Sequence, residues 1–152
     1  MSTVDMTTRD DLGSDLLNVV SRLNRLATQQ ASLDLPYAQA RLLAQIEERG
    51  PSRISELAAA DNCTQPTMTA QVQRLEASGW VSRVPDPSDA RAVLISITDA
   101  GAATLDAARA ARSAVIAPHL AALDPVERAT LGDAVPILRR LLAAARTTSS
   151  KE

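Results

Sequence analysis

A run of hydroxyl and amide side chains occupies the middle of the chain, together with one basic residue. Its members, with the proline that lies among them, are Thr64, Gln65, Pro66, Thr67, Thr69, Gln71 and Arg74. Hydroxyl and amide groups hydrogen-bond to the edges of nucleic-acid bases, and an arginine reaches a phosphate or a guanine. These residue types therefore indicate a surface that could read nucleic acid.

The same run has the spacing of a helix. Its apolar members are Met68, Val72 and Leu75. Intervals of four and three residues bury one helical face and leave the polar side chains outside. Thr64 is a suitable N-cap, a proline in the first turn is tolerated, and Gly79 is a natural stop. We predict a helix over residues 64–78, with free N–H groups at residues 64–67 that suit a phosphate.

A second candidate lies in a polar loop over residues 85–91, which contains two prolines. An arginine near the tip of such a loop, here Arg91, can enter the narrow minor groove of A·T-rich DNA. Asp89 is placed to pair with an arginine and to hold the loop in shape. The alternative is that Arg91 is only a solvated charge on a hairpin.

Enzymatic chemistry has little support. Cys63 is the only cysteine and His119 the only histidine, and no triad, glycine-rich phosphate loop or carboxylate pair is present. We therefore predict no enzyme, no metal site and no cofactor. His119 is expected to be exposed. Cys63 is expected to be a buried packing residue, although a thiol beside a helix N-terminus leaves a redox sensor open.

Composition points to a helical protein. The chain has 152 residues, is 45% hydrophobic and contains one Trp, one Tyr and no Phe, so Leu, Ala, Val and Ile must form the core. The net charge of −2 and the balance between residues 53 and 98, four arginines against five acids, are not those of a strongly basic DNA binder. No apolar run approaches the roughly 20 residues of a membrane span. We expect a cytoplasmic protein that contacts no membrane.

The candidate residues need a scaffold, and periodicity predicts one in the order α-α-α-α-β-β-α-α. Helices are expected over residues 11–31, 36–50, 52–60, 64–78, 98–118 and 124–146, and strands over residues 80–84 and 92–97. We expect a disordered leader over residues 1–10, a single domain over residues 11–146 and a polar tail over residues 147–152. Two short helices followed by a hairpin predict a winged helix-turn-helix, in a mainly α protein with a small β-hairpin.

Specific motifs add a family resemblance. The segment from Asp89 through Arg91 and Thr98 to Gly101, read as DARAVLISITDAG, resembles the wing signature of the MarR (multiple antibiotic resistance regulator) family. Residues 54–58 (ISELA) and 66–81 (PTMTAQVQRLEASGWV) are similar to that family's two helix-turn-helix segments. Helix order also matches, so the resemblance covers residues 11–146.

The resemblance implies a homodimeric transcriptional regulator, either a repressor or an activator, that binds double-stranded DNA at a pseudo-palindromic operator. It implies base-reading positions at Thr64, Gln65, Pro66, Thr67, Thr69 and Gln71, and a wing arginine at Arg91. The reading module would span about residues 36–98, with dimerisation helices over about residues 11–32 and 99–146. Release of DNA by a small hydrophobic or aromatic ligand is also implied.

A ligand pocket, if present, is expected where the dimerisation helices meet the reading module, lined by Leu and Ala. Two alternatives stay open. One is a redox-responsive regulator acting through Cys63. The other is a protein-interaction module that has kept the fold and lost DNA binding, which the acidic balance of the reading module favours.

Overall fold

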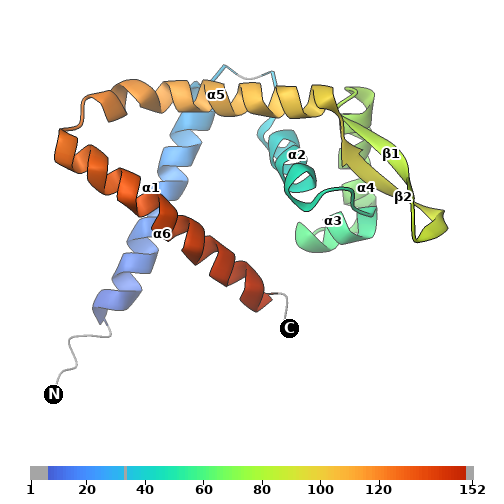
Figure 1. Cartoon of the computed structure of the whole chain (residues 1–152), viewed down its shortest axis with the longest axis horizontal. Coiled ribbons are helices and arrows are strands. Elements are labelled where there is room, and N and C mark those ends of the chain that lie inside the picture. The colour runs from blue at the N-terminus through green and yellow to red at the C-terminus, as the bar shows by residue number, and fades with distance from the viewer. Residues whose placement is uncertain (1–6, 33, 150–152) are drawn as a thin grey trace. The chain divides into compact units, whose positions relative to one another are not determined.

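The computed structural model describes residues 7–32 and 34–149, with side-chain surroundings for residues 11–32 and 34–146. The chain divides into two compact units, residues 1–115 and residues 116–152, which are described separately. Among the described residues, the elements follow the predicted order of four helices, two strands and two helices (Figure 1). The predicted fold class, mainly helical with a small hairpin, is confirmed.

The first unit begins with α1, Thr7–Gln30, and α2, Tyr37–Arg49. Helix α1 starts inside the span for which the sequence predicts a leader, and residues 1–6 lie outside the described residues. Pro36 precedes α2 with φ −57, a value that the proline ring favours. Gly50 ends α2 with φ 75, a left-handed conformation that residues with a Cβ rarely adopt.

Helices α3, Ile54–Ala60, and α4, Gln65–Ala77, form the helix-turn-helix. The turn between them contains Asn62 with φ 51, which asparagine tolerates better than most residues. Arg53 caps α3, and its backbone N–H donates to Glu56 Oε2 over 2.8 Å. Both helices therefore begin within a residue or two of the predicted positions.

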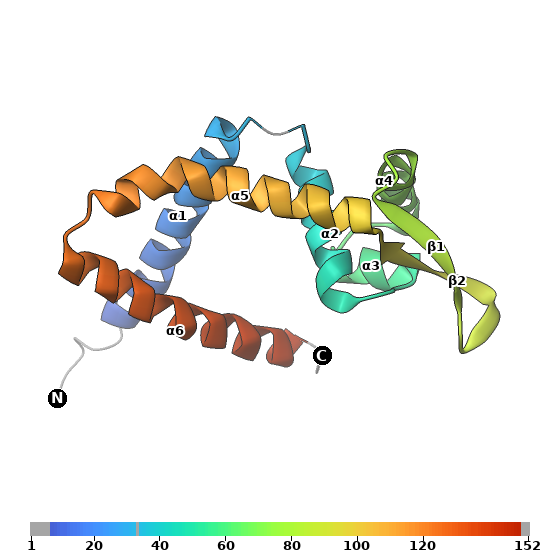
Figure 2. The same ribbon diagram turned by 45° about the horizontal axis from the view of Figure 1, so that its top comes forward.

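The hairpin is tighter than predicted. Strands β1, Val81–Asp86, and β2, Asp89–Ile97, leave only Pro87 and Ser88 between them, so the predicted loop over residues 85–91 is wrong. Pairing runs from Val81 opposite Ile97 to Pro85 opposite Val93, and then shifts. The strands extend further than predicted, and Pro85 is paired with Val93. A proline is tolerated there because both strands of a two-stranded sheet are edge strands. The hairpin projects away from α2, α3 and α4 in both views (Figures 1 and 2).

The core of the first unit joins the helix-turn-helix to the hairpin. Its fully buried side chains are Leu43, Ile46, Leu57, Met68, Val72, Leu75 and Ile95. They come from α2, α3, α4 and β2, so the predicted buried face of α4 is confirmed. Ser52 and Ile95 exchange backbone hydrogen bonds of 3.1 and 2.8 Å, which attach the segment before α3 to the edge of β2.

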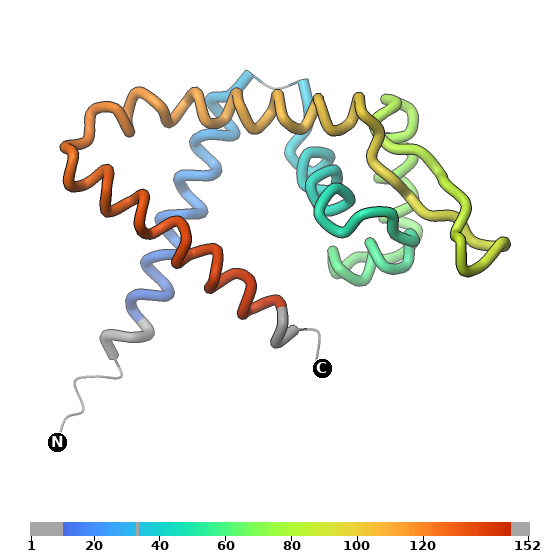
Figure 3. Tube along the Cα trace, in the orientation of Figure 1, coloured from blue at the N-terminus to red at the C-terminus, as the bar shows by residue number. Residues whose placement is uncertain are grey.

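Thr98 joins three elements where β2 passes into α5, Asp99–Ala121. Its hydroxyl donates to the carbonyl of Gly79 over 2.7 Å and accepts from the N–H of Gly101 over 3.0 Å, while its own N–H donates to Trp80 O over 3.0 Å. The path from α4 through the hairpin into α5 is visible in Figure 3. Thr98 is therefore both the predicted helix cap and the junction of α4, wing and α5.

The second unit contains the end of α5 and helix α6, Pro125–Ser149. Asp124 and Glu127 form the predicted capping box, with Glu127 N to Asp124 Oδ1 at 2.8 Å and Asp124 N to Glu127 Oε2 at 3.1 Å. Helix α5 runs through Pro118 to Ala121, so the predicted stop at that proline is wrong. A proline removes one helical hydrogen bond, and α5 continues because the carbonyl of Pro118 accepts from Ala122 N–H over 3.2 Å.

Apolar side chains of α1 and α6 are exposed in the single chain. In α1 they include Leu12, Leu17, Val19, Val20, Leu23 and Leu26; in α6 they include Leu131, Val135, Ile137, Leu138, Leu141 and Leu142. Helix α6 also extends to Ser149, into the span for which the sequence predicts a tail, and residues 150–152 lie outside the described residues.

Candidate nucleic-acid interface

The N-terminal turn of α4 is exposed from Thr64 to Thr67. Thr64 is its N-cap, in extended conformation, and its Oγ1 accepts from Thr67 N over 3.3 Å and lies 2.8 Å from Thr67 Oγ1. Gln65 and Pro66 follow and are also exposed. Because the Thr67 N–H is already bonded and a proline has none, this turn offers fewer free N–H groups to a phosphate than predicted.

The remaining polar side chains predicted to contact DNA follow along α4. Thr69 and Gln71 are half-buried, while Arg74 is exposed near the C-terminal end. Burial of Met68, Val72 and Leu75 leaves these positions on the accessible side of the helix. The six predicted base-reading residues thus lie in the first two turns of α4, with Arg74 further along the helix.

Arg91 is exposed and lies three residues after Ser88, near the hairpin tip. It belongs to β2, in a stretch from Ala90 to Ala92 that falls between the pairs Pro85–Val93 and Asp86–Asp89 and has no opposite residue on β1. Asp89 Oδ1 accepts the backbone N–H of Arg91 over 3.0 Å. Asp89 thus shapes the wing mainly through the backbone.

The principal acid of the wing is Asp86, which the sequence analysis did not single out. Its side chain is only 7% exposed. Oδ2 accepts from Arg53 Nε at 2.9 Å and Nη2 at 2.6 Å, and Oδ1 accepts from the N–H and hydroxyl of Ser88 at 2.9 and 2.7 Å. These Ser88 and Arg53 bonds lower the pKa of Asp86 to about 2, and the bond to Asp86 raises the pKa of Arg53.

A sequence signal for this arrangement exists. Asp86-Pro87-Ser88 is a typical Asx-turn sequence, in which a carboxylate accepts a backbone N–H two residues on. Nothing in the sequence indicates the partner, because Arg53 is 33 residues away along the chain.

A second ion pair links α4 to the wing. Arg83 on β1 donates from Nε to Glu76 Oε1 over 2.8 Å and from Nη2 to Oε2 over 3.0 Å, and the bond to Glu76 raises the pKa of Arg83. Residues 53–98 are all described, and within them Arg74 and Arg91 are the arginines outside any ion pair. The near-neutral reading module therefore leaves two positive side chains available to phosphates.

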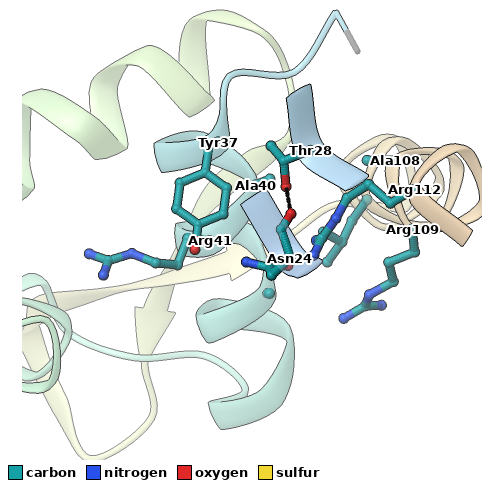
Figure 4. Close-up of a pocket in the computed structure, with 10 residues that line it drawn as sticks. Asn24, Thr28, Tyr37, Ala40, Arg41, Ala108, Arg109 and Arg112 are labelled. Carbon is teal, nitrogen blue, oxygen red and sulfur yellow. Dashed lines mark hydrogen bonds between the residues drawn. The ribbon is translucent and has the colours of Figure 1, made fainter. Parts of the chain in front are cut away.

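A cavity of about 250 Å³ lies elsewhere in the first unit, between α1, α2 and α5 (Figure 4). Its lining residues are Asn24, Thr28, Tyr37, Ala40, Arg41, Ala44, Leu105, Ala108, Arg109 and Arg112. A pocket was expected where these helices meet the reading module. The expected Leu and Ala lining is present in Ala40, Ala44, Leu105 and Ala108, but three arginines, an asparagine, a threonine and a tyrosine also line the cavity.

The arginines of this cavity differ in their partners. Arg41 pairs with Asp61, and Arg109 lies 2.8 Å from Glu47, whose hydrogen bond raises the pKa of Arg109. Arg112 donates to Asn24 Oδ1, but its Nε is buried with no hydrogen-bond partner in the described part of the chain. A buried N–H without an acceptor is costly, so Arg112 retains an unused donor beside the cavity.

The two residues with possible redox or acid–base roles have ordinary surroundings. Cys63 packs against the core, as predicted, but it is half-buried rather than buried, and His119 is exposed. Among residues 7–32 and 34–149, no three His, Cys, Asp or Glu side chains gather as metal ligands. No helix within the same ranges is long and apolar enough to cross a membrane.

Known proteins are similar to this chain in fold and in sequence. The sequence pattern of the MarR family matches residues 35–93. An HTH-type transcriptional regulator of Mycobacterium tuberculosis is 34% identical over 132 residues, which cover 86% of this chain and 92% of that protein. The HTH-type transcriptional repressor NicR of Pseudomonas putida is 35% identical over 99 residues, covering 64% of this chain and 63% of NicR.

Solved structures of MarR-family proteins have a similar fold. Apo MarR from Escherichia coli is similar with a TM-score of 0.66 and 28% identity, covering 84% of this chain and 96% of that one. These relatives are transcriptional regulators rather than enzymes. Together with the capped polar helix, the paired wing and the order of helices, they show that this chain belongs to the MarR family of winged helix-turn-helix transcriptional regulators.

Proposed function

We propose that the protein is a homodimeric repressor in the cytoplasm that binds a pseudo-palindromic operator and leaves it when a small ligand binds. The observation that carries the DNA-binding part is α4, whose core face is buried while its N-terminal turn and polar side remain accessible. A helix so exposed suits the major groove, and the exposed Arg91 of the wing is suited to contact the adjacent minor groove.

In this proposal Thr64, Gln65, Pro66, Thr67, Thr69 and Gln71 face base edges. Arg74 contacts a phosphate or a guanine, Arg91 contacts the minor groove and Asp89 shapes the wing around it. Few positive charges take part, so base and minor-groove contacts carry more of the binding than in a strongly basic reader.

The exposed apolar side chains of α1 and α6 support the homodimer. A monomer would leave many leucines in water, and each is a side chain whose burial contributes about 1.5–3 kcal/mol. A two-fold interface buries the same surface on both subunits and places two α4 helices at half-sites about one DNA turn apart. The name of the relative NicR supports repression as the outcome.

The cavity beside Arg112 supports release by a ligand. Its mixed lining narrows the expected ligand: an aromatic or apolar molecule that also carries a negative charge suits the buried Arg112 Nε and the tyrosine better than a purely hydrophobic one. Since α5 continues from Thr98, ligand binding between α1, α2 and α5 bears directly on the helix that starts at the wing.

A mobility-shift assay on the DNA upstream of the protein's own gene tests the function. We expect a specific shift whose affinity falls with salt, because phosphate contacts release counterions, but less steeply than for a strongly basic reader. Arg91→Ala should weaken binding to all sequences and reduce the salt slope by about 1 per subunit. Gln65→Ala and Thr69→Ala should instead change which sequences are preferred.

No specific shift at low salt would refute DNA binding. A flat salt response, together with a defined protein partner, would favour the interaction-module alternative. For the ligand, aromatic carboxylates are the probe: we expect them to release DNA from the wild type and to be much less effective on Arg112→Gln. Equal release from both proteins would exclude this cavity as the ligand site.

A further inference from the structure

The outer part of the wing is not held by its strand ladder. Regular pairing between β1 and β2 ends at Pro85 opposite Val93, and the next pair is Asp86 opposite Asp89. Residues 90–92, which include Arg91, therefore lack partners on β1. Unpaired strand segments are free to move unless other contacts hold them.

In this unpaired part of the wing, the side chains of two aspartates make the hydrogen bonds that the strand ladder does not. Asp86 Oδ1 accepts both the N–H and the hydroxyl of Ser88, and Asp89 Oδ1 accepts the N–H of Arg91. Their second oxygens face the same guanidinium: Arg53 Nη2 lies 2.6 Å from Asp86 Oδ2 and 4.0 Å from Asp89 Oδ2. The wing tip is thus attached to a residue outside the hairpin.

The backbone of Arg53 is held in place by hydrogen bonds of its own and of the preceding residue. It is the N-cap residue of α3, with its backbone N–H bonded to Glu56. The preceding residue, Ser52, is buried and exchanges two backbone hydrogen bonds with Ile95. The guanidinium therefore starts from backbone that is fixed to both the helix-turn-helix and the base of β2.

We propose that Arg53 is a positioning residue for DNA binding, which acts through Asp86 to hold the unpaired segment that carries Arg91 in its binding orientation. The guanidinium donates to Asp86 from both Nε and Nη2, a forked geometry that a lysine cannot reproduce. The inference rests on the proposed function, because it assigns a role in binding the operator.

The rival role for Arg53 is direct contact with a phosphate. The two roles predict opposite effects of Asp86→Asn. If Arg53 positions the wing, loss of the carboxylate loosens the wing and weakens binding. If Arg53 is a phosphate contact restrained by Asp86, removal of that negative charge frees the guanidinium and strengthens binding.

A double-mutant cycle on operator binding tests the proposal, with folding of each variant checked by thermal unfolding. We expect Arg53→Gln, Arg53→Lys and Asp86→Asn each to lose about tenfold in affinity, similar to Arg91→Ala, since a specific contact is worth about that much. The double variant of Arg53→Gln and Arg91→Ala should bind as Arg91→Ala does, because one effect acts through the other.

Arg83→Gln is the matched control, since Arg83 has an equally close carboxylate partner, Glu76, that does not touch the wing tip. Its effect should add to that of Arg91→Ala. In the free protein, hydrogen exchange at the Ser88 and Arg91 amides should be faster in Arg53→Gln and unchanged in Arg83→Gln.

The outcomes separate the two proposals. Tighter binding by Asp86→Asn, full binding by Arg53→Lys, or additive losses in the cycle would each overturn the positioning role while DNA binding itself stands. Failure of the wild type to bind any operator would refute the proposed function and with it the role in DNA binding, whatever the exchange of the wing amides shows.

Discussion

Replacing Gly101 with alanine tests the junction of α4, the wing and α5. A Cβ at this position would lie 2.1 Å from Trp80 O, 2.9 Å from Trp80 C and 3.0 Å from Ile97 Cγ1. The backbone of Gly101 is in an ordinary helical conformation with negative φ, so alanine is excluded here by space alone. Because the nearest atom is a backbone carbonyl, relief requires the start of α5 to move by more than about 1 Å.

The size of the effect follows from what that movement disturbs. Overpacking costs about 1–3 kcal/mol. The hydrogen bonds from Thr98 to Trp80 O and Gly79 O, at 3.0 and 2.7 Å, cross the same gap and would be lost. Each contributes about 1 kcal/mol. Alanine regains about 1 kcal/mol as the better helix former. We therefore expect Gly101→Ala to lower the free energy of unfolding by about 2–4 kcal/mol.

Urea unfolding followed by circular dichroism is the assay. Gly132→Ala is the matched control, because this glycine also lies within a helix and its added Cβ meets no heavy atom of the described chain within 4 Å. It should be neutral or stabilising by up to about 1 kcal/mol. Equal stabilities of Gly101→Ala and the wild type would refute the packing argument, and a similar loss in Gly132→Ala would show that the cause is not the Trp80 carbonyl.

Three further predictions concern other parts of the molecule. Thr98→Val should cost about 1–2 kcal/mol in urea unfolding, because it removes the helix cap and the bond to Gly79 O, whereas Thr98→Ser should be close to wild type; equal losses in both would argue against the hydroxyl. The pKa of Asp86 is lowered to about 2, so its stabilisation is complete above about pH 4 and is lost as the pH falls toward 2. Asp86→Asn should therefore lose less Tm than wild type between pH 4 and 2, and parallel curves would contradict this. Leu17→Glu and Leu142→Glu should shift the proposed dimer to monomer in light scattering, while Val93→Glu, which changes an exposed apolar residue of the wing, should stay dimeric. Dimers throughout would exclude α1 and α6 as the interface.

Local patterns account for most of the fold that could be predicted. The capped turn at Thr64, the buried spacing of Met68, Val72 and Leu75, and the capping box at Asp124 are all properties of neighbouring residues, and the structure has them as predicted. Predictions failed where local preference yielded to wider context. Pro118 did not end α5, and the hairpin used two prolines within or beside its strands.

The sequence by itself determined which side of α4 is polar, where the wing lies and which family the chain resembles, because these depend on periodicity and short motifs. Only the tertiary structure decided which charged side chains pair with one another and which remain unpaired. Arg53 with Asp86, Arg83 with Glu76, and Arg112 beside Asn24 are separated along the chain by 33, 7 and 88 residues. Such partners meet only when the helices and the hairpin pack, since the geometry of an ion pair depends on the position of whole elements. For this reason the excess of acidic over basic residues in the reading module could be counted from the sequence. Which two arginines remain outside ion pairs, and so available to DNA, could not be predicted from it.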